Sequence, residues 1–193
     1  MFNITFEKGL KMAKLPYLSI EDLSEEDQPI YTHIAATRGT MLNLHRMLFN
    51  NPKAAELVTD LGEYIRYRSP LDNATREIII LSTAREINNE YEWTQHKPEA
   101  TKAGVSNDVI EFINSGKQST QIEPRERTII EAVKQIVQNR KLNDATFESI
   151  LNLLGTKHML EFVIIVAYYS MIGLIIDTIG VELEDGKESS LKV

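Results

Sequence analysis

Apolar residues along the chain recur mostly at intervals of three and four, the spacing that places side chains on one face of an α-helix. Ile129, Val133, Ile136 and Val137 form one such stripe. No run of alternating β-branched residues predicts a strand. The pattern therefore predicts an all-α protein, with helices over residues 23–39, 40–50, 51–68, 71–88, 89–104, 107–116, 123–141, 144–155 and 157–180.

Polar residues with capping ability precede most of these segments, and glycine follows several of them. A Ser, Asp, Asn or Thr side chain can accept a free N–H of the first helical turn, and glycine tolerates the left-handed backbone that ends a helix. The predicted caps are Ser24, Asp72 or Asn73, Ser106, Asn143 and Thr156, and the predicted stops include Gly39, Gly104 and Gly155.

The last predicted helix is apolar on all sides between Phe162 and Ile176, apart from its tyrosines, Ser170 and Gly173. These fifteen residues extend about 22 Å as a helix, which is shorter than the hydrocarbon core of a membrane at about 30 Å. We therefore expect a buried central helix and no membrane span. Because a helix that is apolar all round must be surrounded, another subunit is expected to supply part of its cover.

The composition narrows the classes of function. The chain has 193 residues, which suits one domain, and a net charge of −7, which disfavours nucleic acid and anionic membrane surfaces as partners. It has no cysteine, so disulfides, thiolate metal sites and thiol nucleophiles are excluded. The N-terminal residues do not read as a secretory signal, so a cytoplasmic location is expected.

Glu77 is the first candidate for chemistry. It stands at the head of an apolar stripe that continues through Ile80, Leu81 and Ala84. A carboxylate that faces a core is paired or has a raised pKa. Two interpretations stay open: Glu77 takes part in a site, or it only favours the helix N-terminus and pairs with Arg76.

Glu92 and His96 are the second candidate, because residues four apart share a helix face. The glutamate can orient the imidazole as a proton donor or acceptor, and Trp93 and Tyr91 can exclude water. The alternative is that Glu92 closes an N-x-x-E capping pattern with Asn89 and that the pair only stabilises the helix. Glu77, Glu92 and His96 could in principle bind a metal, but HExxH is absent, so no metal or other cofactor is expected.

Several segments resemble the carboxymuconolactone decarboxylase family of the alkylhydroperoxidase D-like superfamily. They are "RGTMLNLHRMLFNNP", "SPLDNATREIIILSTA", "NEYEWTQHKPEATKAGVSNDVIEFI" and "IDTIGVEL", and together they extend from about residue 38 to residue 184. The most specific part is E-x-x-x-L followed by E-W-x-x-H and A-x-x-x-G. The resemblance implies an all-helical alkylhydroperoxidase D-like bundle over residues 19–184, between an irregular extension (1–18) and a loose polar tail (185–193). It also implies a homo-oligomer, a trimer or hexamer.

The resemblance also bears on the site. The thiol peroxidases of the superfamily carry a C-x-x-C pair before a histidine and a glutamate upstream. Here these positions hold Asn89, Glu92, His96 and Glu77. Dithiol peroxidase chemistry is therefore excluded, whereas the acid and the imidazole are retained. The resemblance favours catalytic roles for Glu77, Glu92 and His96.

The leading functional prediction is cofactor-independent acid–base chemistry, such as decarboxylation of a small lactone or carboxylic acid. Trp93, Tyr91 and Arg85 are the expected substrate-binding residues, and an anion-binding arginine is sought among Arg38, Arg46, Arg76 and Arg85. Two alternatives remain open: an acid–base isomerase or hydrolase, and a non-catalytic oligomer that binds a small molecule.

Overall fold

The computed structural model describes residues 13–116 and 122–192, and these residues form helices and connecting segments without any strand. The all-α prediction is therefore confirmed. Within the described residues the α-helices are α1 (Gln28–Arg38), α2 (Asn43–Leu48), α3 (Pro52–Glu63), α4 (Asn73–Glu86), α5 (Glu90–Lys102), α6 (Asn107–Ser115), α7 (Pro124–Asn139) and α8 (Asp144–Ile179). A short 3-10 turn, η1 (Ile20–Asp22), precedes α1, and a π-helical turn, η2 (Tyr64–Arg68), follows α3.

Most of the predicted caps are confirmed. Asp72 accepts the N–H of Thr75 at 2.8 Å, and Ser106 and Asn143 cap α6 and α8 in the same way. Gly39 ends α1 with a left-handed φ of 73°. Ser24 caps a turn that precedes α1: its hydroxyl accepts the Asp27 N–H at 3.3 Å and donates to the Asp27 carboxylate at 2.6 Å, whereas α1 itself begins at Gln28.

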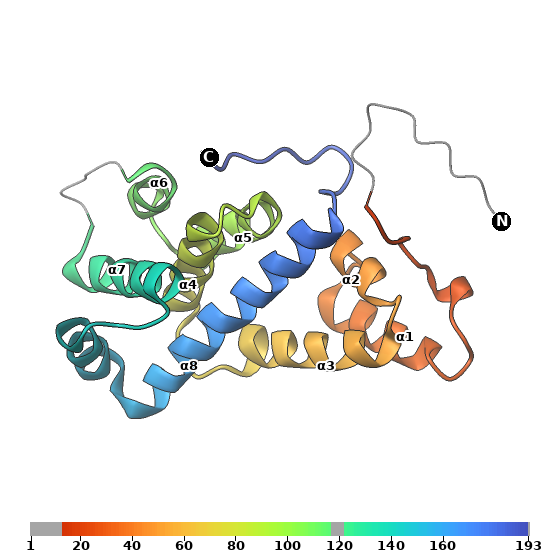
Figure 1. Cartoon of the computed structure of the whole chain (residues 1–193), viewed down its shortest axis with the longest axis horizontal. Helices are drawn as coiled ribbons and strands as arrows, with labels where there is room; N and C mark the ends of the chain where they lie inside the picture. Colours follow the sequence, from red (N-terminus) through yellow and green to blue (C-terminus); the bar gives the residue numbers. More distant parts are fainter. Residues whose placement is uncertain (1–12, 117–121, 193) are drawn as a thin grey trace.

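Helix α8 runs through the middle of the molecule and separates two groups of helices, with α4 to α7 on one side and α1 to α3 on the other (Figure 1). Helix α4 packs against α5, α6, α7 and α8, and its side chains from Ile78 to Leu81 are buried in the largest core cluster. Every residue of α4 from Thr75 to Ala84 is buried, because other helices surround it.

The expectation of a central apolar helix is supported by α8. Gly155, with φ 75° and ψ 165°, interrupts the helix, which agrees with the predicted stop there. The helix is long and apolar enough to cross a membrane, but half of its most apolar window is buried inside this protein, as in the core helix of a globular fold. On its open side, Leu160 and Leu174 are 64% and 68% exposed.

The C-terminal tail differs from the prediction. The Trp93 indole N–H donates to the Ser190 hydroxyl at 3.2 Å, and the Lys192 N–H donates to the Asn114 side chain at 2.9 Å. Leu191 is buried in the main core cluster. The expectation of a loose end is therefore wrong up to residue 192, because Leu191 anchors the tail in the core. Residues 1–12 of the predicted extension lie outside the described residues, and residues 13–18 are irregular as predicted.

Candidate active site

Glu77 and His96 meet between α4 and α5. The two helices are joined by a tight connection in which Asn88 has a φ of 54°, so they pack closely against each other. Glu77 Oε2 lies 2.8 Å from His96 Nδ1, and both side chains are 4% exposed. A carboxylate at this distance fixes the ring orientation and favours a proton on Nδ1.

Glu92 lies on the other side of the same imidazole. Its Oε2 is 3.5 Å from His96 Nε2, and its side chain is 5% exposed. The cap of α5 is the Asn89 side chain, which accepts the Glu92 N–H at 2.8 Å. Glu92 therefore does not close the predicted capping pattern, and its carboxyl group is available to the imidazole.

The two carboxyl groups have opposite pKa shifts. Burial acts to raise the pKa of Glu77, but the hydrogen bond and charge of His96, with Arg76 and Arg66, outweigh burial and lower it. Burial raises the pKa of Glu92 above its ordinary value, and His96, Arg66 and Arg38 oppose the shift only in part. Glu77 is therefore the ionised partner, and Glu92 is the carboxyl group that holds a proton more readily.

A cavity of about 40 Å³ opens beside Glu92 and His96. This volume holds about three water molecules. The polar groups in its wall come from helices on both sides of α8: Arg38, His45, Arg66, Tyr91, Glu92, Gln95, His96, Tyr168 and Tyr169. Glu77 does not line the cavity, so it orients His96 from behind while Glu92 and His96 face the space where a ligand would bind.

Tyrosines enclose this part of the cavity. The Tyr169 ring packs edge-on against the His96 ring with centroids 5.0 Å apart, and the Tyr168 ring contacts that of Tyr169. Tyr91 donates its hydroxyl proton to Glu184 at 2.6 Å, and Gln95 donates to the same carboxylate. Burial raises the pKa of the Tyr91 hydroxyl, and its bond to Glu184 raises it further. The tyrosines therefore stay neutral.

Two of the predicted substrate-binding residues lie away from the cavity. Trp93 is fully buried in the main core cluster. Arg85 donates to the Asn114 carbonyl at 2.9 Å and to Asn88 at 2.8 Å, so it ties α4 to α6. Tyr91 alone of the three contributes to the wall.

Among the arginines proposed for anion binding, Arg38 lines the cavity. Neither Arg46 nor Arg76 lines the cavity: Arg46 donates to the Tyr17 carbonyl, and the Arg76 Nε atom lies 3.7 Å from Glu77. Sequence reasoning missed Arg66, which lines the cavity from η2. Nothing in the local sequence distinguishes it from Arg68 two residues later.

His45 was also missed as a site residue. His45 is only 7% exposed. Its Nδ1 accepts the Leu42 N–H at 3.4 Å. Burial, with the charges of Arg38 and Arg66, lowers the pKa of His45 to about 4. The ring is therefore neutral at pH 7, with Nε2 as its proton-bearing atom. Tyr168 and Tyr169 also line the cavity. Their position within an otherwise apolar segment is the sequence feature that could have indicated this part of the wall.

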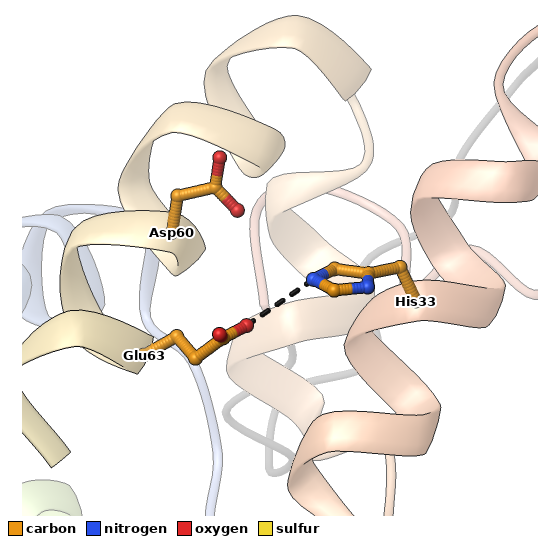
Figure 2. A group of neighbouring side chains, drawn as sticks. All are labelled: His33, Asp60 and Glu63. Atoms are coloured by element: carbon orange, nitrogen blue, oxygen red, sulfur yellow. Dashed lines mark hydrogen bonds and ion pairs between the residues drawn. The ribbon is translucent and has the colours of Figure 1, made fainter. Parts of the chain in front are cut away.

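A second group of potential metal ligands lies on the surface between α1 and α3, where the side chains of His33, Asp60 and Glu63 converge (Figure 2). His33 Nε2 is 3.2 Å from Glu63 Oε2, and Glu63 also pairs with Arg68 at 3.5 Å. The His33 side chain is 57% exposed. Because Glu63 already has two partners, the group is an ordinary surface ion-pair network.

Comparison with protein families gives a match to the carboxymuconolactone decarboxylase family over residues 52–135. This segment contains Glu77, Glu92 and His96. Over this segment the chain is similar to the family. No curated protein sequence matches it significantly.

Solved structures show the same fold. A peroxidase-related protein from Ralstonia eutropha JMP134 with an alkylhydroperoxidase AhpD core has a TM-score of 0.76 at 16% identity, covering 90% of this chain and 93% of that one. A peroxidase-related protein from Silicibacter sp. TM1040 has a TM-score of 0.76 at 12% identity, covering 94% and 96%. The debrominase Bmp8 has a TM-score of 0.72 at 14% identity, covering 87% and 90%. At these identities the likeness shows an AhpD-like fold alone.

Proposed function

We propose that this protein is a cofactor-independent acid–base enzyme that acts on a small lactone or carboxylic acid, with decarboxylation as the leading reaction. The observation that carries this proposal is the buried series Glu77–His96–Glu92, in which contacts of 2.8 Å and 3.5 Å join two carboxyl groups through one imidazole beside a cavity. A proton donor and its orienting partner are the parts that such chemistry needs.

The chemical step balances with these groups. The bond between the carboxylate carbon and its neighbour breaks, and its electron pair enters the conjugated carbonyl system of the substrate as carbon dioxide leaves. A proton held between Glu92 and His96 then moves to the carbanionic carbon, and solvent restores it. Glu77 stays ionised throughout and stabilises the imidazolium that forms when His96 takes up the replacement proton.

The absence of cysteine supports acid–base chemistry over thiol chemistry. The related debrominase was solved with 2,3,4-tribromopyrrole as a cysteine-to-alanine variant. This chain has no cysteine, and the thiol positions of the peroxidases correspond to Asn89 and Glu92. Asn89 caps α5, whereas the carboxyl group of Glu92 faces the cavity. An acid therefore occupies a position at which the thiol enzymes have a nucleophile.

The second candidate function is a non-catalytic oligomer that binds a small molecule. The cavity of about 40 Å³ suits a ligand smaller than a lactone acid, because a lactone acid enters only if side chains in the wall move. A proton-transfer isomerase on a related acid would use the same groups without loss of carbon dioxide.

A homo-oligomer in the cytoplasm remains part of the proposal. The exposed side chains on α8 form an apolar stripe at helical spacing, which suits burial against a second copy: Leu160, Val163, Met171 and Leu174. Size-exclusion chromatography with light scattering would detect the assembly, and a monomer at micromolar concentration would contradict it.

The test of the function is incubation of the purified protein with a panel of lactone acids and unsaturated acids in D₂O. Proton and carbon NMR would report loss of carbon dioxide or entry of deuterium at carbon. We expect turnover for at least one compound, loss of turnover in His96→Ala, and normal turnover in the surface control His33→Ala. Turnover that persists in a folded His96→Ala protein would refute the mechanism.

A further inference from the structure

The wall that contains Glu92 and His96 also carries two guanidinium groups, and among the described residues neither makes an ion pair shorter than 3.9 Å. Among the described residues, Arg38 makes no ion pair: its Nη2 donates to the Thr59 carbonyl at 3.0 Å, and its buried Nε–H has no hydrogen-bond partner. The ion pair of Arg66 is a long contact of 3.9 Å to Glu99, a half-exposed side chain. Such a pair contributes little.

The surroundings hold both guanidinium groups in position. The Arg38 and Arg66 Cζ atoms lie 5.8 Å and 5.7 Å from the centroid of the same Tyr67 ring. Tyr67 therefore offers a cation–π partner to each of them without neutralising either charge. Because both side chains line the cavity, an anion bound there would face two positive charges.

The backbone beneath Arg66 is also unusual. Residues Tyr64–Arg68 form the π-helical turn η2, closed by a 2.8 Å hydrogen bond from the Ser69 N–H to the Tyr64 carbonyl. π-helical turns are rare in proteins, and those that occur are often at functional sites. The extra residue in the turn changes which side chains face inward. Here Arg66 lines the cavity, whereas Arg68 is turned to the surface and pairs with Glu63.

Gly62 shows that space has been kept for these groups. It lies inside α3, where glycine weakens a helix. A Cβ atom there would collide with the Tyr168 hydroxyl and would lie 2.9 Å from Arg38 Nη2. The stability lost by placing glycine inside a helix is explained if the space is needed for Arg38 and Tyr168 to reach the cavity.

We propose that Arg38 and Arg66, with the neutral His45 as a hydrogen-bond donor, form a subsite that binds a carboxylate of the substrate which the reaction retains. Both arginines line the same cavity as Glu92 and His96, so a substrate anchored there by one carboxylate lies beside the acid–base pair. This assignment rests on the proposed function, because it takes the cavity as a substrate site.

The carboxylate bound by the arginines should be one that stays on the product and is not the one lost as carbon dioxide, for an energetic reason. Two guanidinium groups stabilise the anion in the ground state, and loss of that carboxylate as carbon dioxide would remove the charge they bind. Stabilisation of the leaving group in its ground state would raise the barrier. The same contacts made to a spectator carboxylate stabilise the ground state and the transition state equally and affect KM alone.

Calorimetric titration with crotonate and with its neutral isostere crotonamide tests the subsite without any need for turnover. We expect crotonate to bind the wild-type protein at least about tenfold more tightly than crotonamide, which is the scale of a charge-assisted pair. Arg66→Gln should remove that preference. Arg68→Gln, which makes the same change of charge on the same turn, should keep it. Crotonate binding should survive in His96→Ala.

Equal affinity for the two probes in the wild-type protein would overturn the subsite, whatever happens to the variants. Crotonate affinity unchanged in a folded Arg66→Gln protein, or lost equally in Arg68→Gln, would also overturn it. If Arg66→Gln does not fold, Arg38→Gln is measured in its place.

The kinetic arm applies once the panel in D₂O yields a substrate. Arg66→Gln should raise KM at least about tenfold with kcat little changed, whereas His96→Ala should lower kcat. An unchanged KM in Arg66→Gln, with turnover still dependent on His96, would overturn the subsite and leave the proposed function in place. Selective crotonate binding without turnover of any compound would support the subsite and contradict the enzyme.

Discussion

The acid–base wall and the arginine wall of the cavity are assembled in different ways. Glu92 and His96 stand on one helix, four residues apart, and Glu77 approaches from the helix just before it. Arg38 and Arg66 come from α1 and η2, on the other side of α8 from α4 and α5 (Figure 1). The first wall depends on local helical spacing, whereas the second depends on how distant segments pack. Substitutions in one wall should therefore leave the other intact.

The largest expected effect separates the two walls. Glu92→Gln should lower turnover by about 10²–10⁴-fold, the usual contribution of a general acid or base, while crotonate still binds. Steady-state rates and calorimetry on the same preparation measure the two properties. Glu90→Gln, an exposed change on the same helix, should alter neither. Loss of crotonate binding in Glu92→Gln would mean that the walls are not independent.

The next effect concerns His45 on the arginine wall. Its pKa is about 4 in the folded protein and 6.5 ordinarily, so the unfolded chain binds a proton more readily. Titration of His45 therefore leaves the free energy of unfolding unchanged above pH 6.5. As the pH falls toward 4, it lowers that free energy by on the order of 3 kcal/mol in total. Urea unfolding across this range should show a smaller loss for His45→Gln than for wild type. The exposed control His33→Gln should follow wild type, and an equal acid loss in His45→Gln would contradict the assignment.

A smaller effect divides the two glutamates of the acid–base wall. Glu77 has a lowered pKa, so its stabilisation is present above its ordinary value of 4.5 and is lost as the pH falls through the folded value. Glu92 has a raised pKa, so it favours folding at low pH and opposes it as the pH rises through that value. At pH 7, Glu77→Gln should therefore destabilise the protein by about 1–3 kcal/mol, and Glu92→Gln should be neutral or stabilising.

Urea unfolding at pH 7 measures both free energies. Changes of the same sign in the two variants would contradict the opposite charge states assigned to the carboxyl groups. A Glu77→Gln protein that folds well but has an unaltered pH–rate profile would show that Glu77 does not act through His96.

The smallest effect tests the fit of the arginine wall. Gly62→Ala improves helix propensity by up to about 1 kcal/mol, but its Cβ displaces Tyr168 and Arg38, and such overpacking costs about 1–3 kcal/mol. We expect a slight net loss of stability and weaker binding of crotonate. A stabilised Gly62→Ala protein with normal binding would show that the glycine keeps no space for the subsite.

The sequence was a good guide to the acid–base wall because its residues are close along the chain. Glu92 and His96 share a face wherever that segment is helical, and the Asp72 and Asn89 caps determine where α4 and α5 begin. Trp93 and Arg85 show the limit of this reasoning. They lie in the same segments as the site, but the helix turns them toward the core and toward α6, and spacing alone does not tell which neighbour each face meets.

The amino-acid sequence by itself determined an all-helical protein, most of the helix ends, the exclusion of thiol chemistry and the pairing of Glu92 with His96. Those properties follow from hydrogen bonds, caps and spacings within a few residues. The tertiary structure decided that Glu77 stands behind the imidazole, that Arg66 and not Arg68 faces the cavity, and that the C-terminal residues are anchored. These outcomes depend on contacts between distant segments, because packing around α8, and not local preference, sets which side chains are buried together.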